Sequence, residues 1–591
     1  MVGLLVLGAG TAARVGPPLF LAAGLIGCLA LLSALSSLWS GSSELSVIEA
    51  DRVLVYLGIF LAAFLIAQTA DRRQRFAEGI AFAAAVVILL GLVSRLLPHV
   101  LEVTQSLGSG PRLRYPLGYW NANGAMCGIA LALLLWMSRQ ATSTALRWLS
   151  VGAIPAALLT LYFTYSRGGL LAAAVACGCL LILSADRLWL LLTLGAGLLG
   201  ALPAVLAVQS RSSLANNLAE QAAVDQGLTV LLILLAGTAL ALLLFAGLRR
   251  LETRGGQLTG RALELSRDRL LLKRGALLVA LLAIVAAVAV GGRASDRFTE
   301  SDVFPSQPQQ HFSDLSSAGR YDFWRVAVDA FGEKPLLGAG TGTYEFSWEK
   351  HRSIELAVHD AHSLYLEAFA ELGIVGGIAV LALVGGLLWI GFSAWRAARG
   401  RERERNAALL ATMVAFAVVA GFDWFWEIAG LGAVFFLAAG VLTAARCAQL
   451  GGRSPRHREG AYGLVVGGLA LAWIAAIALV GPLLVDREIE SSQQAAAAGN
   501  LASAIDHADT ARSIEPWAAS PYLQLGLLAE LQGDYATAEE RFSQAISRED
   551  RNWQLYYLRS RVRQEAGDAA GARADLERAR QLNPKAPELQ G

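Results

Sequence analysis

Residues 368–393, AFAELGIVGGIAVLALVGGLLWIGFS, form an apolar run of 26 positions in which Glu371 is the one charged residue. A helix needs about 20 predominantly apolar residues to cross a bilayer. This run therefore predicts a transmembrane helix, and similar runs recur along the chain as far as residue 485. The sequence predicts an all-α fold, in the form of a polytopic helical membrane protein.

Thirteen runs qualify as candidate spans. A further apolar run at residues 1–13 is too short to span comfortably, and no clean cleavage site follows it, so we take it as membrane anchor rather than signal peptide. The expected total is about 12–14 transmembrane helices. The thirteen spans are expected near 17–39, 53–69, 77–97, 121–138, 148–165, 168–184, 188–208, 227–248, 275–291, 368–393, 406–421, 428–446 and 461–485.

The composition divides the chain into two parts. Only 16% of the residues are charged, against about 25% in a soluble chain, and the deficit falls on residues 1–485. Residues 486–591 are polar and helix-forming. The five cysteines lie in or beside apolar runs and are expected to be buried thiols rather than disulfides. A formal net charge of +2 by itself argues neither for nor against nucleic acid, and we expect no such partner.

The distribution of Arg and Lys predicts the orientation in the membrane. One set of alternate loops carries 23 basic residues, whereas the opposite short loops carry only Arg112, Arg114 and Arg211. Basic residues close to spans stay on the cytoplasmic side. We therefore expect a multi-pass protein of the cytoplasmic (inner) membrane, with a large extracytoplasmic loop at 292–367 and an extracytoplasmic tail after residue 485.

The tail contains three units with a period of 34 residues. Gly499, Gly533 and Gly567 align, and each is followed by Asn or Asp. This pattern resembles tetratricopeptide repeats, in which paired helices stack into an α-solenoid. The sequence predicts a soluble repeat domain over 486–591, which either binds a partner protein or packs on its own membrane domain.

Two outward segments bring arginines close to predicted helix starts. Arg112 and Arg114 precede Asn121 and Asn123, which are either helix N-caps or part of a phosphate site beside a helix N-terminus. Arg167 lies at an outward turn between two spans, where it either extends to the interface or awaits an anionic ligand.

The large outer loop carries the other candidates. Residues 318–324, with Arg320 and Tyr321, predict the start of an amphipathic helix, and the glycine-rich run 334–344 predicts a flexible turn. His359 and His362 are spaced to share a face, with Asp360 and Glu367 nearby. We expect no metal here, because a third ligand on a firm frame is not evident, and favour proton transfer by a histidine.

The motifs around these residues resemble one known family. His362-Ser363, nine residues and Gly373-Ile-Val-Gly376 resemble the signature of the O-antigen ligase and polymerase superfamily. The stretches 318–324 and 335–340, and the positions of Arg167 and Arg114, are similar to further motifs of that family. The resemblance covers roughly residues 17–446. Gly377 departs from it, because a threonine often follows the last motif glycine, and this leaves ligase against polymerase open.

The resemblance implies an activity. Family members transfer a glycan from undecaprenyl diphosphate to a glycan, lipid or protein acceptor during assembly of cell-surface polysaccharide such as lipopolysaccharide, with inversion and without metal or cofactor. By this resemblance Arg167, Arg320 and Arg114 would bind the diphosphate, and His362 would lie beside the reacting centre. The expected substrate-binding residues are Arg112, Arg114, Asn121, Asn123, Tyr321 and His359.

Three alternatives stay open at this stage. A glycan polymerase would use the same donor with another acceptor. A protein O-oligosaccharyltransferase would use the repeats to present a protein acceptor, so that removing 486–591 would abolish transfer to protein but spare glycan joining. A transporter or membrane-anchored scaffold would need neither Arg167 nor His362.

Overall fold

The computed structural model describes residues 14–101, 111–217, 221–254, 317–451 and 480–590. This part of the chain is helical and contains no strand, which confirms the predicted all-α class. The expected span at 275–291 and most of the one at 461–485 lie outside the described residues. The other eleven expected spans each fall on a helix.

Eight of these helices are long and apolar enough to cross a membrane, so the chain is a multi-pass membrane protein. They are α2 (Pro17–Ser36), α4 (Ala70–Leu96), α5 (Trp120–Gln140), α6 (Thr144–Thr164), α8 (Arg187–Gln209), α10 (Gln221–Arg254), α15 (Leu364–Ala397) and α17 (Ala429–Gln449). The remaining three expected spans fall on the shorter α7 (Arg167–Leu183) and on α3 (Ser43–Ile66) and α16 (Gly400–Val419), whose first turns carry charges.

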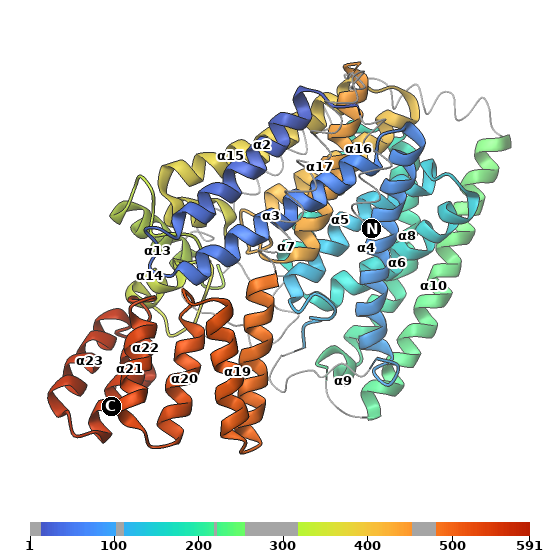
Figure 1. Cartoon of the computed structure of the whole chain (residues 1–591). Coiled ribbons are helices and arrows are strands. Elements are labelled where there is room, and N and C mark those ends of the chain that lie inside the picture. The colour runs from blue at the N-terminus through green and yellow to red at the C-terminus, as the bar shows by residue number, and fades with distance from the viewer. Residues whose placement is uncertain (1–13, 102–110, 218–220, 255–316, 452–479, 591) are drawn as a thin grey trace, which may run out of the picture.

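Helix α5 lies at the centre of the bundle, and every residue of its apolar stretch is buried. It packs against α4, α6, α7 and α16 (Figure 1). Small residues allow the closest of these contacts. A Cβ atom on Gly128 would lie 2.5 Å from the backbone nitrogen of Ala173 in α7, and one on Gly169 would lie 2.7 Å from the backbone of Gly124. These approaches place the first turns of α5 and α7 side by side.

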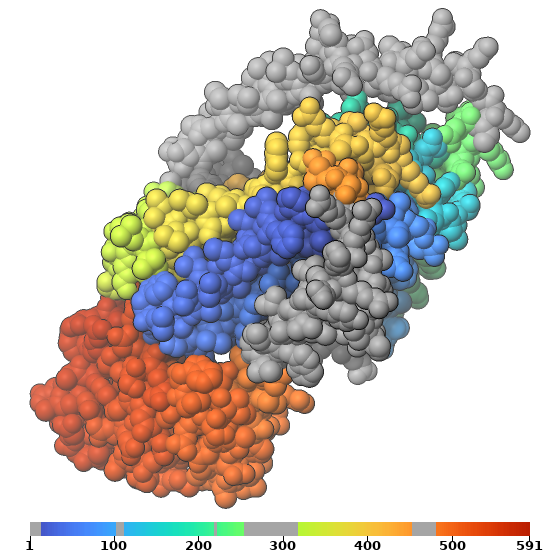
Figure 2. Space-filling model, turned by 45° about the horizontal axis from the view of Figure 1, so that its top comes forward, coloured from blue at the N-terminus to red at the C-terminus, as the bar shows by residue number. Residues whose placement is uncertain are grey.

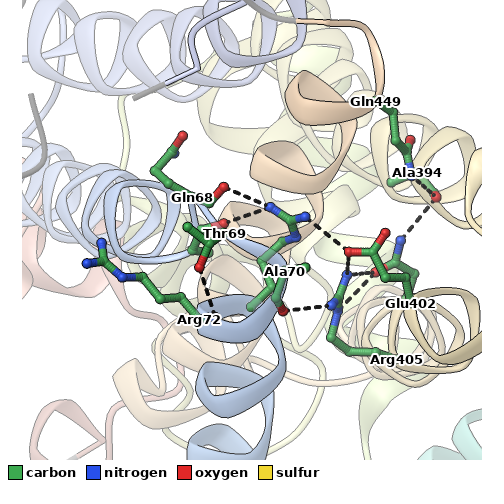
Figure 3. Close-up of polar contacts among 11 residues, drawn as sticks. Gln68, Thr69, Ala70, Arg72, Ala394, Glu402, Arg405 and Gln449 are labelled. Carbon is green, nitrogen blue, oxygen red and sulfur yellow. Dashed lines mark hydrogen bonds and ion pairs between the residues drawn. The ribbon is translucent and has the colours of Figure 1, made fainter. Parts of the chain in front are cut away.

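The ends of α4, α15, α16 and α17 opposite the tail are joined by buried polar groups (Figure 3). Arg73 donates to the carbonyls of Ala67 and Gln68 and to Glu402 at 3.0 Å. Arg405, which is almost fully buried, lies within 3.5 Å of the same Glu402. A buried cation is tolerated because the carboxylate and the carbonyls replace water. The five cysteines are free thiols; three of them are buried as predicted and Cys179 is half-buried, but Cys28 is exposed, so the prediction of burial is wrong for Cys28.

Two helices of the large loop lie against the N-terminal part of α15: α13 (Arg320–Glu333), which confirms the predicted amphipathic helix, and α14 (Tyr344–His351). The glycine-rich run between them forms turns, as predicted, and two of its glycines are closely packed. Gly338 and Gly340 have positive φ, and Cβ atoms there would lie 2.2 Å from the backbone of Glu371 and 2.3 Å from the Ser40 side chain. These glycines permit close packing rather than motion.

The tail consists of a helix over 480–497 followed by α19 (Leu501–Ile514), α20 (Ser520–Leu531), α21 (Tyr535–Ile546), α22 (Trp553–Glu565), α23 (Ala569–Leu582) and the short η2 (Pro587–Leu589). From α19 to α23, each helix packs on the next. The three aligned glycines all adopt positive φ, and the Asn or Asp after each one caps a helix. The aligned positions thus share a conformation, while the tetratricopeptide assignment stays a prediction.

We expect Gly169→Val to destabilise the bundle by about 1–3 kcal/mol, because an overpacked contact forces backbone shifts. Gly178→Val, on the same helix with nothing within 4 Å of its Cβ position, is the matched control and should change little. Thermal unfolding in detergent measures both. Equal unfolding temperatures for the two variants would contradict the close approach of α5 and α7.

Candidate active site

Three separated segments of the chain meet at the buried carboxylate of Asp423, which is 2% exposed. It accepts hydrogen bonds from Tyr119 Oη at 3.0 Å and from Asn121 Nδ2 at 2.8 Å, both at the start of α5. Arg320 Nη2, at the start of α13, donates to it at 2.8 Å. Asp423 itself lies in the turn between α16 and α17. One carboxylate therefore fixes the relative positions of all three segments.

The guanidinium of Arg320 is held along one edge. Its Nε donates to the carbonyl of Phe422 at 2.7 Å, next to the bond from Nη2 to Asp423. Burial by itself would lower the pKa of Arg320, but Asp423 and Tyr119 outweigh it and raise this pKa. Arg320 is thus a fixed cation. Its Nη1 makes no hydrogen bond within the described part of the chain.

His362 lies beside this ion pair, just before α15. Its ring packs on Phe323, with centroids 4.9 Å apart, and its Nδ1 is 3.1 Å from the carbonyl oxygen of Asp360. Burial lowers the pKa of His362, Arg320 lowers it further, and Asp423 opposes both. The ring is therefore neutral near pH 7. Because a carbonyl can only accept, Nδ1 carries the proton and Nε2 keeps a lone pair.

Arg112 and Arg114 lie in the loop before α5. Their guanidiniums stack over the Trp120 ring, 5.0 and 4.7 Å from its centroid. Burial lowers the pKa of Arg112 to about 10, and the charges of Arg167, Arg320 and Arg114 lower it too. Arg112 is therefore close enough to each of the other three arginines to be repelled by it.

The two asparagines of α5 do not cap the helix, so that alternative is wrong. The N-cap is Tyr119, without a side-chain cap bond. Asn123 Nδ2 donates to the carbonyl of Arg114 at 2.5 Å and so holds the arginine loop. Asn121 joins Asp423 to α7, because its Oδ1 accepts from Ser166 Oγ at 2.7 Å.

Arg167 is brought into the site through Ser166, the N-cap of α7, whose Oγ accepts from Gly169 N at 3.0 Å. The chain of contacts thus runs from Ser166 through Asn121 to Asp423 and Arg320. Non-glycine residues with positive φ mark the same places: Tyr165, Ala318 and His362 are three of the four in the described residues. Such backbone conformations are costly and concentrate at functional sites.

The remaining predicted residues lie further from this centre. Tyr321 is 40% exposed. His359 points to α14, where its Nδ1 is 2.8 Å from Glu345, so the two histidines do not share a ligand. Among the described residues, the group that could hold a metal ion is Asp360, Glu367 and Glu427, with ligand atoms within 4.8 Å of one another, and neither histidine belongs to it. Metal independence stays a prediction.

Residues 226–381 match the O-antigen ligase family model. This O-antigen ligase segment contains Arg320, His362 and the glycines after them, and confirms the resemblance drawn from their spacing. It supports a glycosyl-transferring role in cell-surface polysaccharide assembly. No curated protein matches the chain.

Sequence reasoning missed the residue at the centre of the candidate site. Asp423 lies outside the matched segment, in a six-residue loop rich in aromatic residues, 422–427. An acidic residue in so short a loop between spans was a usable signal, because charge there is costly and tends to be functional. Sequence reasoning also did not propose Tyr119, whose hydroxyl donates to Asp423.

We expect His362 to titrate below the ordinary value of 6.5. The pKa should fall further in Asp423→Asn, because a nearby negative charge favours the imidazolium, and should rise in Arg320→Gln. NMR of ring-labelled histidine, assigned with His362→Gln, measures both shifts. The control Asp329→Asn, an exposed residue of α13, should leave the pKa where it is. A titration unmoved by both Asp423→Asn and Arg320→Gln would contradict the site geometry.

Proposed function

We propose that this site transfers a glycan from undecaprenyl diphosphate to an acceptor hydroxyl, as an O-antigen ligase-like, inverting and metal-independent glycosyltransferase. The observation that carries the proposal is that Arg320, paired with Asp423, lies close to Arg112, which also lies close to Arg114 and Arg167, beside a histidine whose pKa is lowered. Arg112, Arg114, Arg167 and Arg320 together outweigh the charge of Asp423, so the site favours an anionic ligand.

The arginines can bind the diphosphate leaving group and stabilise its negative charge. When the bond between the anomeric carbon and the diphosphate breaks, its electron pair moves to the diphosphate, whose negative charge grows. Guanidiniums match phosphate oxygens two at a time. Arg320 costs no reorganisation during the reaction, because Asp423 and Phe422 already hold one edge of it. Charges fixed in a shielded site stabilise the transition state more than the same charges in water.

His362 can act as the general base for the acceptor hydroxyl. Its Nε2 lone pair takes the proton of the acceptor hydroxyl while that oxygen forms a bond to the anomeric carbon from the face opposite the diphosphate. The configuration inverts, and the proton passes from His362 to solvent. No nucleotide is needed, because the donor arrives activated. A base with a pKa below the working pH is already deprotonated when the acceptor binds.

We place this chemistry on the outer side of the cytoplasmic membrane. The bias of 23 basic residues against three puts the loops before α5 and after α16 outside. The tail lies at the same end of the bundle as α13 and α14 (Figure 1), which supports an extracytoplasmic tail. A polymerase or a protein O-oligosaccharyltransferase would share the donor and the site, and differ in the acceptor.

The test is donor consumption by purified protein in detergent, with an oligosaccharide on undecaprenyl diphosphate and EDTA throughout. We expect Arg320→Ala to lose about 2–4 kcal/mol of transition-state stabilisation, as when an oxyanion donor is removed. His362→Ala should also lose turnover. Arg325→Ala is the matched control on the same helix: it pairs with Asp322 at 3.4 Å and should stay near wild type.

Each outcome is informative. Turnover in EDTA with loss in both site variants supports a metal-independent glycosyltransferase, and the product's size separates ligase from polymerase. Turnover that EDTA abolishes would assign a metal and point to Asp360, Glu367 and Glu427. Near-normal turnover in Arg320→Ala would contradict the proposed role of the arginines. Binding of donor without consumption by wild type would favour a transporter or scaffold.

A further inference from the structure

Helix α14 lies between the candidate site and the tail. On its inner side, Tyr344 Oη donates to the carbonyl of Phe323 at 2.8 Å and so holds α13, the helix that begins with Arg320. Trp348 Nε1 donates to the carbonyl of Leu356 at 2.7 Å. Glu345 pairs with His359. Both the arginine helix and the segment that leads to His362 are therefore attached to α14.

The tail holds the other side of the same helix. Trp553 Nε1 donates to Glu349 Oε1 at 2.8 Å, and Arg551 Nη2 donates to Ser347 Oγ at 3.3 Å. Just past α14, Arg352 Nη2 donates to Asn583 Oδ1 at 3.0 Å, and Lys585 donates to the carbonyl of Ser353. Contacts therefore follow α14 and the residues after it.

A second contact anchors the tail to the membrane bundle. Glu44, in the first turn of α3, accepts from the backbone nitrogens of Ala519 at 2.8 Å and Ser520 at 3.1 Å, at the start of α20. Gly41 packs so closely on Arg551 that a Cβ atom would lie 2.9 Å from its Cδ. Figure 2 shows the orange and red surface of the tail against the blue surface of α2 and α3. The bundle thus holds the tail in place, and the tail in turn contacts α14.

Helix α14 needs such support. It has eight residues, and an isolated helix shorter than about 12–15 residues is marginal in water. Residues 352–363, which follow it, form no helix. The position of both segments therefore depends on tertiary contacts, and the tail supplies those on the side away from the site.

We propose that the tail is a positioning element for the candidate site: its contact with α14, made by Trp553 and Arg551, holds the Arg320 helix and the His362 segment in their reactive arrangement. The catalytic part of this statement rests on the proposed function. Trp553 and Arg551 are positioning residues that act through α14. Removing residues 486–591 therefore lowers transfer to every acceptor, so truncation does not distinguish protein from glycan acceptors.

The test removes one contact from either side in a chain that keeps both the membrane bundle and the tail. Trp553→Phe keeps the buried ring and loses the N–H, whereas Glu349→Ala leaves the tail unchanged and loses the acceptor. Glu349→Gln keeps an acceptor oxygen and is the conservative rescue. Arg561→Ala is the control, because Arg561 pairs within the tail with Glu530 at 2.6 Å.

Two readouts are compared: hydrogen exchange at 320–323 and 344–363, and kcat and KM for the lipid-linked donor. We expect Trp553→Phe and Glu349→Ala to speed exchange in both segments and to lower kcat about tenfold with the donor KM unchanged, because misplaced reacting groups slow the chemical step. The double variant should be no worse than either single one, since both remove the same bond. Glu349→Gln and Arg561→Ala should resemble wild type.

Faster exchange with an unchanged kcat would overturn the positioning role, and so would unchanged exchange in both single variants. A donor KM that rises while kcat stays constant would assign the tail to substrate binding instead. If wild type itself consumes no donor, the proposed function fails. Exchange at 320–323 and 359–363 then still decides whether the tail positions these segments, so the two failures are distinguishable.

Discussion

The site depends on the ion pair between Asp423 and Arg320. Asp423 is buried, and a buried carboxylate is stable only when cations and hydrogen-bond donors replace its water. Here the replacements come from Tyr119, Asn121 and Arg320, which belong to parts of the chain that are far apart. If any of these segments moved, it would leave charge uncompensated, so each has one favourable position. The carboxylate thereby orders the first turns of α5 and α13 around the turn after α16.

The contacts of this site extend to two other parts of the structure, the start of α7 and the tail. Through Asn121 and Ser166 it reaches the start of α7, where Gly124 and Gly169 let the two helices meet. Through α13 it reaches α14 and the tail. The polar site is therefore connected to close helix contacts inside the bundle on one side. On the other side it is connected to hydrogen bonds between the large loop and the tail. A substitution in the contact of α5 with α7, or in the contact of α14 with the tail, would therefore affect the positions of the arginines through these packing contacts and hydrogen bonds.

Much of this could be predicted from the sequence. The apolar runs located the long helices of the bundle that the structure describes, and the spacing from His362 to Gly376 resembles the family whose model matches residues 226–381. Arg320 and His362 were named from those motifs, and the structure brings them together around Asp423. The predictions that failed concerned surroundings: Asn121 and Asn123 as possible helix caps, and Cys28 as a buried thiol. The close packing of the 334–344 glycines was also not foreseen. For Asn121 and for these glycines the deciding contact lies on another segment of the chain.

The sequence by itself determined the helical membrane architecture, because hydropathy and its run length are local properties that a bilayer converts directly into spanning helices. It also determined which residues could carry the chemistry. Only the tertiary structure decided that Asp423 is their common partner and that the tail supports α14. The reason is physical: Asn121 and Asp423 are 302 positions apart, and Trp553 and Glu349 are 204 apart. Contacts at such separations arise from packing, which no local pattern encodes.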